Sequence, residues 1–396
     1  MKKILIALIV IAAAAATAIF IYRYQLVQYS ADKIIRSRLP GYVKIDTIIF
    51  DARASRVSFK GFRILNPPDF ANKNLLEIEE VSCSYKMNGM NIAEGFEIYD
   101  PVFRRFLLNI EHLSNGKLNL TEMSASLQDN LPKSEAPGRP SNIADKAAAK
   151  AVSDFIKLPE QFSITDGRII FTDRFRMSRP YILSFENING NIFLRFDERY
   201  TRVLGVNSTG EGLFNGRQGE VIKWDIKFDP TAPRLTMSNR FEVWNLEITP
   251  LEPYYDRYSP LVFKNGVFSG LLIFDFDNGR IGSTNEIHLA DFRFYVKPGY
   301  ENAAFWETTV PDLVKYFSTP SGEIVFDFKI KGDMENPQFY LGPISKQALA
   351  AMAIDKISSA IQSLSNKGPS ASPGGPKSDI EKAKEYIDLF KGMIKK

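Results

Sequence analysis

The sequence has few side chains suited to catalysis or to metal binding. Its 396 residues include one cysteine, Cys83, and two histidines, His112 and His288. A lone cysteine can form neither an internal disulfide nor a cysteine-rich zinc site, and the two histidines lie far apart in the chain. The motifs of zinc peptidases, of α/β-hydrolases and of P-loop nucleotide binding are all missing from it. The sequence therefore predicts a protein that is not an enzyme and that needs no metal and no cofactor.

One fragment partly resembles a calcium-binding loop. It runs Asp275-Phe-Asp-Asn-Gly279, with Glu286 at the twelfth position. Such a loop needs glycine at its sixth position, where this chain has Arg280. It also needs a helix on each side, whereas apolar and polar residues alternate on both sides here. We therefore interpret Asn278-Gly279 as the turn of a β-hairpin.

A large excess of charge of one sign is also lacking. The 50 basic and 46 acidic residues give a formal net charge of +4, and the two signs are interleaved along the chain. Nucleic-acid binding calls for a basic stripe or a recognisable binding motif, and the sequence has neither. We expect no nucleic-acid partner.

The long hydrophobic run of the sequence lies at its start, from Ile4 to Tyr22. About 19 residues of helix cover roughly 28 Å, which is close to the thickness of a bilayer core. A cleaved signal peptide is the alternative, because residues 16–18 have the small side chains of a cleavage site. Residues 19–21 continue the apolar run past that point and favour a retained membrane anchor. The anchor residues that we single out are Ile4, Ile9, Phe20 and Tyr22.

The remaining chain is dominated by alternation of apolar and polar residues. This period of two is that of a β-strand, whose successive side chains point to opposite faces of a sheet. In the clearest runs, charges such as Lys223, Asp225, Asp327 and Lys329 stand between large apolar residues. The 30 phenylalanines also favour strands. The residues that we expect on the apolar side of the sheet are Ile222, Trp224, Ile226, Phe228, Phe274, Ile324, Phe326, Phe328 and Ile330.

The expected fold is mainly β: an N-terminal transmembrane helix, then an elongated, curled antiparallel β-sheet groove, then a helical C-terminal tail. Pairs that favour tight hairpin turns recur and suggest a meander. They are Asp166-Gly167, Asn189-Gly190, Asn215-Gly216, Asn265-Gly266 and Asn278-Gly279. A closed sandwich filled by its own side chains is the alternative architecture.

Composition divides the chain further. Residues 1–23 are the anchor, 24–120 a first β region that begins with a short helix, 121–160 a linker with an Ala-rich helix, 161–343 a second β region, 344–365 a helix, 366–378 a flexible linker and 379–396 an amphipathic basic helix. We expect the last helix to dock on a membrane surface or on an envelope protein partner; packing back onto the sheet is the alternative.

Several short motifs resemble, in their order, those of AsmA-like proteins of the bacterial envelope. Residues 57–70 read Val-Ser-Phe-Lys-Gly-Phe-Arg-Ile-Leu-Asn-Pro-Pro-Asp-Phe, and they are followed by Tyr-Asp-Pro-Val at 99–102 and Asn-Gly-Lys-Leu-Asn-Leu at 115–120. Gly332 to Phe339 resembles the closing strand and turn of that family. Asp69 stands where the family usually has glycine. The resemblance covers residues 1 to about 120 best and 160–343 more loosely.

The resemblance implies a single-pass inner-membrane anchor and a periplasmic β-groove, as in bridge-like lipid transfer proteins. It also implies a role in phospholipid transport and in outer-membrane lipid homeostasis. Lys2 and Lys3 favour this orientation, and the basic residues after the anchor weaken the bias. The expected partners are phospholipid acyl chains and the inner membrane, and the residues expected on the apolar side of the sheet are the candidates to contact lipid. The alternatives are an anchored scaffold for envelope proteins without lipid transfer and, as a third class, an envelope hydrolase.

Overall fold

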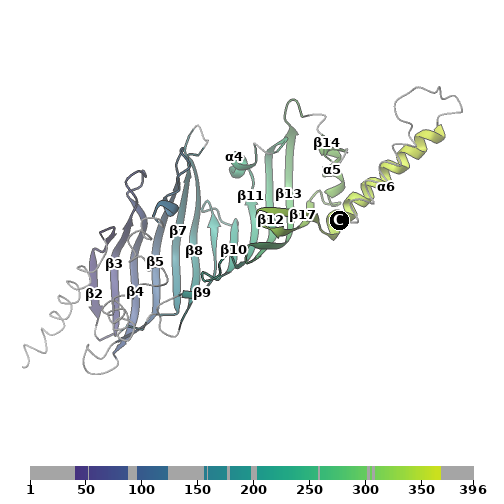
Figure 1. Ribbon diagram of the computed structural model, residues 1–396. Coiled ribbons are helices and arrows are strands. Elements are labelled where there is room, and N and C mark those ends of the chain that lie inside the picture. The colour runs from purple at the N-terminus through teal and green to yellow at the C-terminus, as the bar shows by residue number, and fades with distance from the viewer. Residues whose placement is uncertain are drawn as a thin grey trace, which may run out of the picture. The chain divides into compact units, whose positions relative to one another are not determined.

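The structure is a computed structural model, shown in Figure 1. It describes residues 41–51, 53–87, 96–123, 156–157, 159–175, 179–197, 203–256, 259–300, 304–305 and 308–366. The chain divides into two compact units, Met1–Arg217 and Gln218–Lys396. The described residues are mainly β, and the strands form open sheets rather than closed ones. The predicted linker at 121–160 therefore lies within the first unit.

The first unit is built on strands in the order β1-β3-β4-β5-β7-β8-β9, with β2 paired to β3 and β6 paired to β5. Their bounds are β1 (Val43–Lys44), β2 (Thr47–Asp51), β3 (Arg56–Leu65), β4 (Asn74–Met87), β5 (Phe96–His112), β6 (Ile156–Lys157), β7 (Gln161–Asp173), β8 (Tyr181–Phe196) and β9 (Val203–Phe214). Neighbouring strands in Figure 1 thus follow the order of the sequence.

The prediction of a wholly antiparallel sheet is wrong at β5. This strand pairs in parallel with β6 and with β7, and the sheet is therefore mixed. The residues between β5 and β7 form a long connection, and a chain of that length can return to the starting end of β5 before the next strand begins. A tight hairpin turn would have imposed the antiparallel direction instead. The linker predicted there is what permits the parallel pair.

The second unit has strands in the order β10-β11-β12-β13-β16-β17, and each neighbouring pair is antiparallel. Its elements are β10 (Val221–Phe228), β11 (Met237–Glu247), η2 (Thr249–Leu251), α4 (Glu252–Tyr255), β12 (Leu261–Asp277), β13 (Arg280–Val296), β14 (Ala304–Phe305), β15 (Thr308–Thr309), α5 (Val310–Phe317), β16 (Ile324–Asp333), β17 (Asn336–Leu341) and α6 (Pro343–Asn366). The strands β14 and β15 form a separate small sheet. α6 occupies the stretch in which a helix was predicted.

Long strands in both units contain a point at which the alternation of side chains is reset. Phe59 and Phe62 are three residues apart, and strict alternation would place them on opposite faces. Both nevertheless pack against the same buried cluster. Gly61 lies between them with φ of +62°, in the left-handed region, so the chain turns its side chains back to the same side.

Residues in the left-handed conformation recur within other strands of both units. Left-handed φ values are found at Arg105 in β5 (50°), Asp166 in β7 (55°) and Asn187 in β8 (52°), and in the second unit at Asn245 in β11 (52°) and Asp291 in β13 (49°). In β7, β8, β11 and β13 a break in the pairing register accompanies them. Bulges of this kind strengthen the twist of a strand while keeping its apolar residues on one side.

Several predicted hairpin turns are wrong. Asp166-Gly167, Asn189-Gly190 and Asn265-Gly266 lie inside β7, β8 and β12, whereas Asn278-Gly279 joins β12 to β13 as predicted. Of the three wrong pairs, only Asp166-Gly167 has a residue of positive φ, Asp166, which Asp accepts in a bulge as readily as in a turn. Gly167 also leaves the space that the ring of Phe106 occupies, because any β-carbon there would collide with that ring.

The segments at 57–70 and 115–120 meet in the interior of the first unit. Asn119 Nδ2 donates to Asn66 Oδ1 (3.0 Å) and to the carbonyl oxygen of Asn109 (2.7 Å). Asn119 Oδ1 accepts from the backbone N–H of Glu111 (3.0 Å), and the Glu111 carboxylate accepts from the backbone amides of residues 71–72 (3.2 and 2.6 Å). Both Asn119 and Glu111 are fully buried. The network ties the Asn-Pro-Pro loop to β5 and to the loop that follows β5.

The start of α6 is held by β16. The carboxylate of Asp327 accepts from the N–H groups of Ser345 (2.7 Å) and Ile344 (3.3 Å), which satisfies donors that the first turn of a helix leaves without intrahelical partners. The pattern of alternation had placed Asp327 on the solvated side. Leu349 and Met352 of α6 pack with Ile324, so the helix is fixed by a cap and by an apolar contact.

We predict that Asn119→Leu lowers the free energy of unfolding of the first unit by about 2–4 kcal/mol. The substitution leaves the buried groups of Asn66, Asn109 and Glu111 without their partner, and each unpaired buried group costs about 1–3 kcal/mol. Urea denaturation measures the change. Asn207→Leu, at an exposed position of β9, is the matched control and should change it by less than about 0.5 kcal/mol. Equal effects of the two substitutions would contradict a structural role of the network.

Candidate functional site: the apolar face of the second unit

The pairing register decides which predicted residues share a face of the second unit. Directly paired residues of neighbouring antiparallel strands point to the same side of the sheet. Ile226 of β10 is paired with Asn239 of β11, and Asn239 is paired with Phe274 of β12. The other apolar residues of β10 stand at even spacing from Ile226 and point the same way.

The same face continues across the remaining strands. Phe274 is paired with Ser283 of β13, and farther along β13 the residue Ile287 is paired with Phe326 of β16. All of the predicted lipid-contacting residues therefore lie on one face, which we call the apolar face: Ile222, Trp224, Ile226 and Phe228 of β10, Phe274 of β12, and Ile324, Phe326, Phe328 and Ile330 of β16.

The edge strand β17 adds an aromatic residue that sequence reasoning missed. Phe339 is paired with Ile330, and its ring stacks on that of Phe328 with centroids 5.2 Å apart. Phe328 is in turn 5.7 Å from Phe326. Phe339 is 53% exposed, so this row of rings ends at an open edge. The sequence does mark this residue as apolar-facing, because Phe339 and Leu341 alternate with polar positions in the same way as the residues of β16.

Most of the predicted side chains on the apolar face are neither sealed in a core nor fully open. Those of β10 are partly buried, and Phe228 is exposed at 36%. The largest side chains that are fully buried in the described residues are polar, and they include Asn285 on this face at 1% exposed. Asn285 donates to Ser283 Oγ (2.9 Å) and accepts from the N–H of Ile273 (3.2 Å). Most of the predicted apolar side chains of β10 and β16 are therefore only partly removed from solvent.

Helices cover one end of the apolar face. Ile324 is 9% exposed in a cluster with Phe317 of α5 and with Leu349 and Met352 of α6. Phe326 packs against the same cluster, and its ring centroid lies 5.4 Å from that of Phe317. Of the predicted residues, Ile324 therefore contacts the protein's own core. Phe326 lies at the border between that core and the accessible part of the face.

The opposite face of the same sheet is polar. Lys223 of β10 stands opposite Glu242 of β11, and Asp225 stands opposite Arg240. Opposite charges directly across two strands stabilise the pair modestly and keep the surface hydrated. In β10 this pairing sets charged residues against oppositely charged residues of β11, and Lys223 and Lys227 are exposed.

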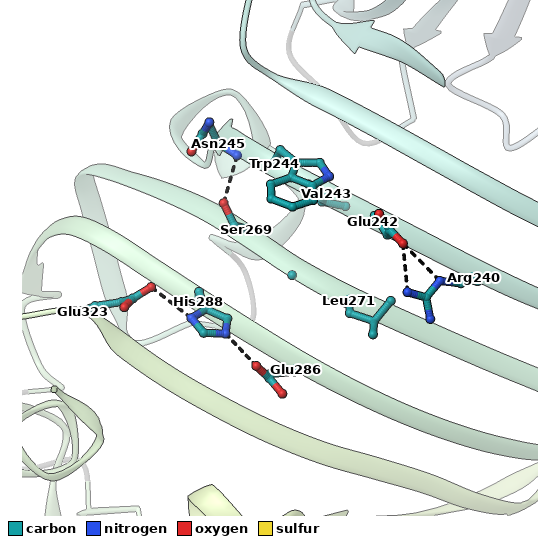
Figure 2. A pocket seen from close by; sticks show the side chains of 11 residues that line it. Arg240, Glu242, Val243, Trp244, Asn245, Ser269, Leu271, Glu286, His288 and Glu323 are labelled. Carbon is teal, nitrogen blue, oxygen red and sulfur yellow. Dashed lines mark hydrogen bonds and ion pairs between the residues drawn. The ribbon is translucent and has the colours of Figure 1, made fainter. Parts of the chain in front are cut away.

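A pocket of about 610 Å³ lies on this polar face (Figure 2). It extends over β11, β12 and β13, where Glu242, Leu271 and Glu286 are paired in a row. Within it, His288 Nε2 lies 2.8 Å from Glu286 Oε1, and His288 Nδ1 lies 3.0 Å from Glu323 Oε1. Figure 2 shows the imidazole between the two carboxylates, with the indole of Trp244 in the same pocket.

The first unit has an apolar face of its own. Phe59 of β3 is paired with Val81 of β4, and Val81 with Phe103 of β5. The ring of Phe103 stacks on Phe162 of β7 at 5.7 Å between centroids. Sequence reasoning did not select these residues, although the same alternation marks them. The sheet of the first unit therefore also carries apolar side chains together on one face.

The described residues offer little for metal or thiol chemistry. Among them, no group of three or more His, Cys, Asp or Glu side chains is arranged to hold a metal ion. Cys83 is 5% exposed, and burial raises the pKa of its thiol to about 11, so the reactive thiolate is disfavoured. His112 lies 3.2 Å from the buried carboxylate of Asp173 in the first unit.

Some predicted features lie outside the described residues. These are the anchor residues Ile4, Ile9, Phe20 and Tyr22, the short helix at the start of 24–120, most of the linker and Ala-rich helix at 121–160, nearly all of the linker at 366–378, and the basic helix at 379–396. Within the described ranges, no helix combines the length and the apolar character that crossing a bilayer requires.

We predict that His288 makes the stability of the second unit depend on pH. Hydrogen bonding to Glu286, and then to Glu323, raises the pKa of His288 above its ordinary value of 6.5, against an opposing effect of partial burial. The stabilising contribution is therefore complete below the pKa of the unfolded chain and is lost as the pH rises through the higher pKa of the folded protein. Because these side chains are partly exposed, the contribution is at most about 1 kcal/mol.

Thermal unfolding of the wild-type protein and of His288→Gln, measured from about pH 5 to about pH 9, checks this. The difference in Tm between the two proteins should be largest at the acidic end and should shrink as the pH rises. A difference that stays constant, or that grows with pH, would show that the imidazolium form is not the stabilising one.

Comparisons with known proteins give no assignment: neither the family models nor the curated proteins contain a match to this chain. The likeness to AsmA-like proteins therefore stays a prediction from the motifs quoted above.

Proposed function

We propose that this chain binds the acyl chains of phospholipids along the apolar face of its β-sheet. The observation that supports this best is the register of the second unit, which gathers the predicted residues of β10, β12 and β16 on one side. The accessible part of that side is lined by aromatic and aliphatic groups, from Phe228 of β10 to Phe339 of the edge strand β17.

The physical argument is one of uncovered hydrocarbon. A sheet with one apolar face normally buries it against another layer. The described residues of the second unit include no second large sheet, and α5 and α6 cover the region around Ile324. An acyl chain laid on the remaining rings gains about 0.8 kcal/mol for each CH₂ group removed from water. Binding of this kind needs no catalytic residue, in keeping with the poor supply of catalytic groups in the sequence.

The proposal includes an anchor and a location. The apolar run at 4–22 holds the chain in the bacterial inner membrane, and the sheet lies in the periplasm, curled lengthwise into a groove. In that place it takes part in the phospholipid balance of the outer membrane. The length of the apolar run and the resemblance to AsmA-like proteins support this part of the proposal.

A scaffold that holds envelope proteins, without lipid transfer, is the second candidate. One observation favours it: α6 is fixed at its start by Asp327 and carries Ile354, which is 62% exposed. An anchored helix with exposed apolar side chains suits a protein partner. If the chain is a scaffold, the apolar face carries no lipid.

We predict that wild-type protein extracted in mild detergent carries phospholipid and that Phe228→Asp carries roughly fivefold less or lower still. Loss of about 1 kcal/mol of contact with hydrocarbon weakens binding roughly fivefold, and a carboxylate on the face weakens it further. Lipid mass spectrometry on the purified proteins provides the measurement. Lys227→Asp is the matched control, because it places the same carboxylate one residue away on the polar face.

The two variants separate the candidate functions. Retention of lipid by Lys227→Asp together with its loss from Phe228→Asp supports a lipid-binding face. Lipid-free wild-type protein that purifies with a stable protein partner would support the scaffold, and equal lipid content of the two variants would exclude the apolar face as the binding surface. Circular dichroism of both variants establishes that they are folded.

A further inference from the structure

We propose that the pocket on the polar face of the second unit is a binding site for a neutral carbohydrate, whose sugar ring stacks on the indole of Trp244. The pocket lies on the side opposite to the apolar face, as the pairing of Asp225 with Arg240 and of Ile226 with Asn239 requires. The proposal therefore does not depend on lipid binding.

Trp244 is in an unusual position for so large an apolar side chain. It is 51% exposed on a face otherwise rich in charged residues. The bulge at Asn245 fixes the backbone next to it, because the N–H of Asn245 donates to Ser269 Oγ (2.9 Å) from the neighbouring strand. Figure 2 shows this bond beside the indole, which lies above the sheet within the pocket. The indole is thus half exposed, next to a backbone position that is fixed by this hydrogen bond.

The charged groups around Trp244 are in contact with one another, with three carboxylates against Arg240 and His288. Arg240 and Glu242 form an ion pair with 2.8 Å between Nη2 and Oε1. His288 lies between Glu286 and Glu323, at 2.8 and 3.0 Å. The excess of carboxylate disfavours an anionic ligand, whereas a neutral ligand can bind to the outer lone pairs and N–H groups without separating these partners.

A sugar ring matches this combination of groups. One side of a pyranose carries C–H groups of slightly positive charge, which are attracted to the negative face of an indole. Its hydroxyls both donate and accept hydrogen bonds, and the rim offers acceptors in Glu242, Glu286 and Glu323 and donors in Arg240. The pocket volume of about 610 Å³ is within the range of roughly 300–1,000 Å³ that small-molecule sites occupy.

Two other ligand classes fit less well. An acyl chain would bury the polar rim without supplying hydrogen bonds, at a cost for each unpaired group. A quaternary organic cation such as choline would be drawn to the aromatic ring and to the excess of carboxylate, but it would leave most of the hydrogen-bonding groups of the rim unused, so it is the competing ligand in the test. The pocket therefore favours a neutral polyhydroxyl ligand.

Isothermal titration calorimetry on the full chain in detergent tests the proposal, with maltohexaose and chitohexaose as neutral probes and choline chloride as a cationic probe. We expect at least one oligosaccharide to bind and choline not to bind. Trp244→Ala should weaken oligosaccharide binding at least tenfold. Tyr295 is an exposed aromatic residue of β13 that lies outside the pocket, and Tyr295→Ala should leave oligosaccharide binding unchanged.

Three results would overturn the proposal: no heat of binding from either oligosaccharide, binding of choline that depends on Trp244, or equal losses in Trp244→Ala and Tyr295→Ala. Phospholipid content of the Trp244→Ala protein is measured in parallel. Unchanged lipid with lost sugar binding supports two separate sites on the two faces. Loss of both would mean that the substitution disrupts the sheet and that Trp244 has a structural role instead.

Discussion

The structure depends on keeping large apolar side chains on one side of a twisted sheet over long strands. Strict alternation gives this separation only while the backbone stays regular. Strands such as β12 and β13 span Leu261–Asp277 and Arg280–Val296, and over such lengths the accumulated twist would strain a flat ladder. The left-handed residues relieve that strain and restore the alternation. Without them, Phe59 and Phe62 would point to opposite sides, and the apolar surface of β3 would be split in two.

This constraint also explains why one face of the sheet in the second unit is apolar and the other is charged. The apolar face keeps rings such as Phe328 and Phe339 together, and the polar face carries opposite charges in register, as in Lys223 opposite Glu242. The two faces therefore differ in the class of molecule that each is proposed to bind. The same sheet supports the lipid proposal on one side and the carbohydrate proposal on the other.

The sequence predicts this fold as far as local patterns determine it. Alternation was sufficient to identify β10 and β16 and to select residues that the register then gathers on one face. The directions and the partners of the strands were harder to predict. The parallel pairing of β5 with β7 depends on a long connection, and no local sequence pattern indicates it. Pairs such as Asp166-Gly167 were misread because positive φ serves bulges and turns alike. The role of Asp327 as a cap for α6 depends on residues distant in the sequence, so no spacing rule could reveal it.

The parallel join has a consequence for how the protein folds. The strands β1 to β5 pair with near neighbours in the sequence and can assemble as the chain emerges, whereas β7 must first close the long connection from His112. Closing a loop of that size costs entropy before any contact repays it, and sheets with such distant pairings fold slowly. We therefore expect β5 to remain an open, aggregation-prone edge during synthesis, and a chaperone that shields this edge would speed maturation more than one acting on the second unit.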